Sequence, residues 1–250
     1  DDFTFDAEKG TYALKAGVND CSSLIGGKVY PGSIKLKANE DGEYKKERLG
    51  NTVPTVSGGF GLNARWKGFD FTAFFNYSLG NKIVNATKLG SSFYSGSSKN
   101  WNINDHFTST NRYSWIDPST GTNLLSSASI KANGEAWTIN RLNEVNTGSS
   151  IWNPAAATVM PLVDWAVEDG SFLRVNNITI GYTLPKLLVS KLNIQNIRIY
   201  VTGYNLHCFT KYSGTDPEVD CCTSTPMTPG IDYAAYPKSR SFVGGINVTF

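Results

Sequence analysis

The sequence predicts an all-β protein, because three features favour extended strands. Residues 240–250 alternate strictly between apolar or glycine residues and small or polar ones, and the last residue is the aromatic Phe250. Two further alternating stretches, 55–66 and 69–79, follow one another and are long for strands of a globular protein. The composition agrees, with 24 glycines, 12% aromatic residues and 18% charged residues, a charged fraction below the usual quarter.

These strands fit two architectures. A barrel in the outer membrane turns the apolar face of each strand toward lipid and the other face toward a polar interior. A secreted β-sandwich that binds carbohydrate uses the same alternation but buries its apolar face between two sheets. The exposure of the apolar face therefore discriminates between the two architectures.

The bulk properties argue against several other classes of function. The net charge of +2 gives no support to nucleic-acid binding, and no apolar run reaches the roughly 18 residues of a transmembrane helix. Paired carboxylates occur at Glu168-Asp169 and at Asp216 with Glu218, but such acids in turns are usually solvated. No catalytic Ser/His/Asp or Cys/His pattern accompanies them, so no enzyme is predicted. The four cysteines lack CxxC spacing, so neither a zinc site nor a cofactor is predicted.

Residues 1–54 are rich in turns and are expected to hold a strand, within Thr11–Gly17, and a loop. Residues Lys37–Glu43 resemble half of a calcium-binding loop. Lys37 would occupy the first ligand position, where its charge repels a cation, and no glutamate stands at the twelfth place. We therefore interpret this stretch as a charged loop and predict no metal site.

Residues 55–79 give the clearest structural signal, a hairpin. Lys67-Gly68 separates the two alternating stretches and is a two-residue turn of the kind that closes hairpins. Aromatic residues cluster beside this turn, where a barrel has its aromatic girdle. The alternate face of the hairpin is polar and would line the interior of a barrel with Asn63, Arg65, Asp70 and Asn76.

Residues 80–170 are interpreted as one long surface loop, because the alternation is lost and Ser, Asn, Gly and Thr predominate. A short helix is possible at Lys82–Leu89. Four tryptophans are scattered through the loop, and they either hold its own small core or contact a substrate or partner. These residues are Trp101, Trp115, Trp137 and Trp152.

Residues 171–250 are expected to contain three more strands, at 171–184, 195–207 and 239–250. The apolar residues change parity at Asn176-Asn177, which predicts a β-bulge. Pro185 ends the first of these strands. In the second strand Arg198 falls on the polar face, and a second long loop, 208–237, leads to the final strand.

Several blocks of the sequence resemble SusC/RagA-type TonB-dependent transporters. The longest are residues 167–185 (VEDGSFLRVNNITIGYTLP) and residues 203–218 (GYNLHCFTKYSGTDPE). Residues 234–242 (AAYPKSRSF), 27–34 (GKVYPGSI) and 59–70 (GFGLNARWKGFD) match further blocks of the family, so the resemblance spans most of the chain.

This resemblance implies an importer of glycans or oligopeptides in the bacterial outer membrane. The family fold is a 22-stranded antiparallel barrel around an amino-terminal plug, with a SusD-like lipoprotein over the mouth and the TonB complex acting through the plug. The chain looks like the carboxyl-terminal part of the barrel: a strand and extracellular loop at 1–54, a hairpin at 55–79, an extracellular loop at 80–170 and the last three strands at 171–250, with the plug absent. Its partners would be that lipoprotein, TonB, the rest of the barrel, lipid and the substrate, and no nucleic acid.

The sequence departs from the family in two respects. Lys37 replaces an acidic residue, which agrees with the absence of a predicted metal site. Cys208, Cys221 and Cys222 are unusual for the family, and because the outer surface permits disulfides, we predict a bridge from Cys208 to Cys221 or Cys222.

Two structural expectations follow from the barrel interpretation. Five strands cannot close a barrel, so the edge strands at 55–66 and 239–250 should pair with strands outside this sequence. The final strand would be the carboxyl-terminal assembly strand, with Phe242, Ile246, Val248 and Phe250 on its apolar face. The apolar face should be exposed to solvent at Phe60, Leu62, Phe71, Phe75, Ile197, Ile199, Val248 and Phe250.

Overall fold

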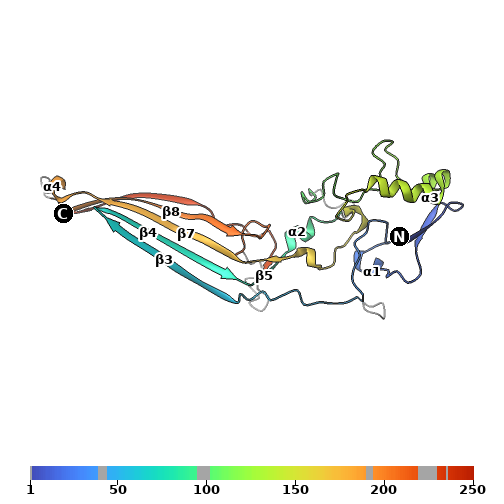
Figure 1. Ribbon diagram of the computed structural model, residues 1–250. Helices are drawn as coiled ribbons and strands as arrows, with labels where there is room; N and C mark the ends of the chain where they lie inside the picture. Colours follow the sequence, from blue (N-terminus) through green and yellow to red (C-terminus); the bar gives the residue numbers. More distant parts are fainter. Residues whose placement is uncertain (1, 39–43, 95–101, 190–193, 219–229, 235) are drawn as a thin grey trace. The chain divides into compact units, whose positions relative to one another are not determined.

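The computed structural model describes residues 2–38, 44–94, 102–189, 194–218, 230–234 and 236–250 (Figure 1). The chain divides into two compact units. The first comprises residues 1–48 and 88–163, and the second comprises residues 49–87 and 164–250. Each unit is described by itself.

The second unit is built on a five-stranded antiparallel sheet. Its strands are β3 (Val56–Trp66), β4 (Phe69–Leu79), β7 (Phe172–Thr183), β8 (Asn196–Thr210) and β10 (Ser241–Thr249). They lie side by side in the order β10-β8-β7-β4-β3 (Figure 1). The five strands expected from the sequence are confirmed, as are the two expected edges, β3 and β10.

The β3–β4 hairpin has the turn that the sequence predicts. Lys67 and Gly68 both have positive φ, 47° and 91°, as the two central residues of a type I′ turn require. This turn matches the right-handed twist of the flanking strands, so the pairing runs without interruption from Trp66↔Phe69 to Val56↔Leu79. The turn thereby fixes which side chains share a face.

The predicted bulge in the third strand is also confirmed. Phe75 pairs with Val175, whereas Phe74 pairs with Asn177, so Asn176 is an extra residue in β7. The extra residue reverses the parity of β7 and keeps its apolar side chains on one face of the sheet, although the sequence changes phase.

The apolar face of this sheet is exposed, which is the arrangement of a barrel wall and not of a sandwich. Exposed fractions reach 65% at Ile246 and 80% at Phe250. Of the eight residues expected to be exposed, Phe75 and Ile197 are half-buried, Phe75 because its ring stacks on Phe60 at a centroid distance of 4.9 Å. The exposed members are Phe60, Leu62, Phe71, Ile199, Val248 and Phe250.

A small sheet lies beyond the large one in the second unit. Its order is β6-β5-β9, with β5 (Lys82–Asn85) between β6 (Val167–Asp169) and β9 (Ile231–Asp232). The helix predicted at Lys82–Leu89 is therefore wrong in its first half, because these residues find strand partners on both sides. Two short helical turns also belong to the described part of this unit, η3 (Asp164–Ala166) and α4 (Lys186–Val189), and a third, α2 (Ala86–Gly90), lies at the boundary with the first unit.

The first unit contains the main departure from the sequence prediction. Residues Ser127–Val145 form a helix, α3, inside the stretch interpreted as a loop, with non-helical backbone at Gly134. The helix was missed because few of its residues are apolar and Gly134 interrupts their spacing. The other elements are β1 (Phe3–Asp6), β2 (Thr11–Leu14), α1 (Ser22–Ile25) and η2 (Pro154–Ala156).

The helix α3 packs on a small core with the β1–β2 hairpin. Phe5, Leu124, Ile130 and Leu142 are its buried members. Ser126 caps the helix by accepting a hydrogen bond from the backbone N–H of Ser129. In the described part of the chain, no helix is both long and apolar enough to cross a membrane.

An ion pair fixes α3 to the preceding turn. Arg141 donates to both carboxylate oxygens of Asp117, at 2.7 and 2.8 Å, and Asp117 is buried. Hydrogen bonds from Arg141 and then Ser119 hold the pKa of the Asp117 carboxyl well below its usual range. The stabilisation that results is present above the unfolded pKa of about 4 and is lost as the pH falls toward the lowered pKa.

Replacing Asp117 with asparagine is therefore expected to lower the melting temperature at pH 7. The difference from the unaltered protein should shrink between about pH 4 and pH 2, as thermal unfolding monitored by circular dichroism would reveal. Asp105→Asn is the control, because the Asp105 side chain is 94% exposed. A melting-temperature difference that does not change with pH would exclude this role of Asp117.

Candidate functional site

The candidate site is the face of the five-stranded sheet opposite the apolar one, here called the polar face. Pairing across the strands puts the predicted residues on it: Arg65 lies opposite Asp70, and Asn63 opposite Thr72. Asn76 lies opposite Arg174 of β7. All five residues predicted to line an interior thus share one face, namely Asn63, Arg65, Asp70, Asn76 and Arg198.

Side-chain hydrogen bonds run across the middle of the polar face. Thr72 donates to Asn63 Oδ1 at 3.0 Å, and the hydroxyls of Thr179 and Thr202 lie 2.8 Å apart. These four residues are register partners, so they form a polar row across β3, β4, β7 and β8. Such a row satisfies the side chains within the sheet.

Near the end of the sheet that holds the Lys67-Gly68 turn, an ion pair joins β8 to β4 across β7. Arg198 donates to Asp70 Oδ1 at 2.8 Å and to Oδ2 at 2.5 Å, from β8 to β4. The intervening residue is Gly181, and a Cβ atom there would stand 2.5 Å from Asp70 Oδ1 and 2.6 Å from Arg198 Nη2. The missing side chain of Gly181 therefore makes room for the pair.

A second ion-pair cluster lies toward the other end of the face, around Arg174. Arg174 Nη2 donates to Asp216 Oδ1 and Nε donates to Glu218 Oε2, each at 2.5 Å. Asp216 is buried. The expectation that these acids are solvated is therefore wrong, because the chain beyond β8 folds back and presents them to Arg174.

Sequence reasoning missed Arg174 as a site residue. The signal available was its parity, since Arg174 alternates with the apolar Leu173 and Val175. Its partners lie more than 40 positions away along the chain, which no local pattern reveals. Of the second pair interpreted as solvated, Asp169 is exposed, whereas Glu168 accepts hydrogen bonds from the backbone N–H and the hydroxyl of Ser213.

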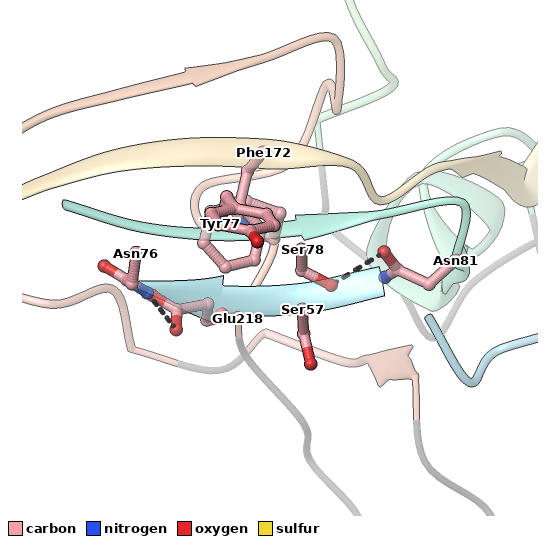
Figure 2. Close-up of a pocket in the computed structure, with 9 residues that line it drawn as sticks. Ser57, Asn76, Tyr77, Ser78, Asn81, Phe172 and Glu218 are labelled. Carbon is pink, nitrogen blue, oxygen red and sulfur yellow. Dashed lines mark hydrogen bonds between the residues drawn. The ribbon is translucent and has the colours of Figure 1, made fainter. Parts of the chain in front are cut away.

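An open pocket of about 410 Å³ lies beside this cluster. Figure 2 shows Asn76 donating to Glu218 Oε1, at 3.1 Å, and Ser78 donating to Asn81 Oδ1, at 3.2 Å. The Asn76 Oδ1 atom is buried and has no hydrogen-bond partner among the described residues. Ser57, Tyr77 and Phe172 are the other labelled residues that line the pocket.

The same part of the second unit is tied to the small sheet. Tyr212 donates to Asp232 Oδ2 at 2.6 Å, and both residues are buried. Burial, and then the hydrogen bond to Asp232, raise the pKa of Tyr212 well above its usual range. The phenol therefore stays protonated and able to donate throughout the physiological pH range.

The cysteine prediction stays a prediction. Cys208 lies on the polar face as the register partner of Arg174, but Cys221 and Cys222 lie outside the described residues. Cys21 belongs to the first unit, where it is buried and burial raises the pKa of its thiol.

The predicted loop aromatics take different positions in the first unit. Trp115 donates its indole N–H to the carbonyl of Pro31 at 2.7 Å, and Trp152 donates to the carbonyl of Ser92 at 3.1 Å; both are half-buried. Trp137 is exposed on α3, and Trp101 lies outside the described residues. Contact of these tryptophans with a substrate or partner stays a prediction.

A long antiparallel sheet with one exposed apolar face and ion pairs on the other face has the pattern of a section of barrel wall. The described residues supply part of such a wall and no closed barrel.

Comparisons with known proteins agree with this class, although no family model matches the sequence. The chain is 29% identical over 249 residues to TonB-dependent receptor P3 of Formosa agariphila, which covers 97% of the chain and 21% of that protein. It is 34% identical over 89 residues to TonB-dependent receptor SusC of Bacteroides thetaiotaomicron, covering 35% of the chain and 8% of that protein. Among solved structures, the chain is similar to the RagAB peptide importer in its closed-closed state, with a TM-score of 0.59 and 23% sequence identity. The match covers 100% of this chain and 22% of the matched importer chain.

The chain is thus similar in sequence to TonB-dependent receptors, SusC among them, and similar in fold to the RagAB importer. It spans about a fifth of the length of the curated relatives P3 and P26 of Formosa agariphila.

Proposed function

We propose that this chain is the carboxyl-terminal part of the wall of a TonB-dependent importer in the bacterial outer membrane, with the polar face lining the lumen. The single observation that carries the proposal is that one continuous sheet exposes most of its apolar side chains on one face and carries the ion pairs of Arg174 and Arg198 on the other. An exposed apolar face is stable in contact with lipid, and a face of paired charges is stable in contact with a water-filled lumen.

The connections between strands support one orientation in the membrane. The Lys67-Gly68 turn and residues 184–195 join strands at one end of the sheet, and residues 80–171 and 211–240 join them at the other. Outer-membrane barrels have short periplasmic turns and longer extracellular connections. The Arg174 cluster then lies toward the extracellular mouth, and the Arg198–Asp70 pair toward the periplasm.

The substrate we propose is a glycan or an oligopeptide. Both are rich in hydrogen-bonding groups, as are the residues proposed to face the lumen: Asn63, Arg65, Asp70, Asn76 and Arg198. The partners we propose are a SusD-like lipoprotein at the mouth, the TonB complex acting through a plug, and the strands that complete the wall. Among the described loop tryptophans of the first unit, Trp137 on α3 is the exposed one and is proposed to contact a substrate or partner.

The decisive test compares two neighbouring residues of β10. Ile246 and Asn247 are both exposed but lie on opposite faces. Each is replaced by a spin-labelled cysteine in the full protein, in its membrane, with the native cysteines changed to serine. The label at Ile246→Cys should collide with lipid-dissolved oxygen, and the label at Asn247→Cys with a water-soluble nickel complex.

Relaxation measurements by electron paramagnetic resonance supply the readout. Equal access of the nickel complex to both labels would contradict the wall proposal, because neither face would then meet lipid. Exclusion of both reagents at Ile246→Cys would instead favour an apolar face buried in protein, as in a β-sandwich.

A further inference from the structure

The chain between β8 and β10 returns to the polar face at both of its described ends. Residues 211–218, here called the return segment, follow β8 directly and bring Asp216 and Glu218 onto Arg174. Lys238, shortly before β10, donates to the same Glu218 carboxylate at 2.8 Å. One cluster therefore joins both ends of this connection to β7.

The burial of Arg174 depends on the return segment. Its side chain is only 5% exposed, although it stands on the face of the sheet that carries the other charges. A buried guanidinium is costly unless it is paired and hydrogen-bonded. Asp216 and Glu218 supply that pairing through two different nitrogens, which the planar fork of arginine allows and a lysine does not.

Further hydrogen bonds give the return segment a defined conformation. Asp216 Oδ1 also accepts from the backbone N–H of Glu218 at 2.9 Å, which closes a tight turn around the buried Pro217. Asn76 of β4 donates to the second oxygen of Glu218. The Glu218 carboxylate is thus held from β4, from β7 and from the approach to β10.

We infer that Arg174 is a positioning residue that anchors the return segment on the polar face as a fixed inner layer of the wall. The segment then narrows the lumen toward its extracellular mouth and sets the position of Glu218 beside the pocket that Asn76 lines (Figure 2). The anchoring stands on the contacts alone, whereas the place in a lumen rests on the proposed function.

A spin label at Thr215→Cys reports on the anchor, because Thr215 is exposed and adjoins Asp216. In the full protein with its native cysteines changed to serine, the label should give a slow-motion spectrum. Arg174→Gln removes both charge-assisted bonds, so the mobile fraction of the spectrum should rise several-fold. Asp216→Asn keeps an acceptor but removes one charge, and an intermediate rise is expected.

Arg198→Gln is the matched control. It breaks an arginine–carboxylate pair on the same face, with two hydrogen bonds as well, but its partner Asp70 belongs to β4 and not to the return segment. The label should keep its slow-motion spectrum in this variant. An equal rise in Arg198→Gln would mean general loosening of the sheet and would overturn the inference, as would unchanged mobility in both Arg174→Gln and Asp216→Asn.

The outcome separates the anchor from the proposed function. If Arg174→Gln does not assemble, Asp216→Asn alone decides, and mobility at the level of the unaltered protein would then count against the anchor. The oxygen and nickel accessibility of Ile246→Cys is measured in parallel samples that carry this label alone, in the same membrane. A mobile return segment with a lipid-exposed Ile246 refutes only the anchor, and an anchored segment with a water-exposed Ile246 refutes only the wall.

Discussion

Replacing Leu62 with arginine is expected to destabilise the folded protein in its membrane by about 2–4 kcal/mol, the cost of a cation on the lipid-facing surface near the bilayer midplane. Leu62 stands in the middle of β3 and is 54% exposed on the apolar face. In lipid, no water solvates the introduced charge. Urea unfolding of the protein in vesicles, followed by tryptophan fluorescence, measures the change.

The neighbouring residue supplies the control for this substitution. Asn63 is also exposed but lies on the polar face, where it accepts one hydrogen bond from Thr72. Asn63→Arg should cost less than about 1 kcal/mol, because an exposed polar contact contributes little and the lumen solvates the charge. Equal destabilisation by the two substitutions would be incompatible with a lipid-facing Leu62.

Replacing Gly181 with alanine is expected to cost about 1–3 kcal/mol, the usual penalty of an added carbon in a filled space. The new Cβ atom would meet both partners of the Arg198–Asp70 pair at less than van der Waals distance. Gly181 is not among the glycines with positive φ, so the penalty arises from this contact rather than from the backbone. The free energy of unfolding in vesicles again gives the value.

A double-mutant design tests the cause of that penalty. In a background of Asp70→Ala with Arg198→Ala, the crowding atoms are gone, and Gly181→Ala should become neutral or slightly stabilising, because glycine weakens the interior of a strand. If the substitution costs the same in both backgrounds, the ion pair is not the reason that glycine stands there.

The sequence predicted the large sheet well because its information is local. Side chains alternate with a period of two, so runs such as 240–250 disclose both the strand and its two faces. A two-residue turn with glycine predicts the hairpin, and the parity change at Asn176-Asn177 predicts the bulge. The helix α3 was missed for the converse reason, since its few buried residues and its glycine leave no clear helical period.

Among the candidate site residues, the alternation by itself determined which side chains share the polar face, including Asp70 and Arg198. Only the tertiary structure decided which of them meet. Arg174 takes its carboxylates from residues 42 and 44 positions later, because the chain beyond β8 turns back over the sheet. Such pairing depends on the path of the backbone through space, and the positions of charged residues in the sequence do not indicate that path.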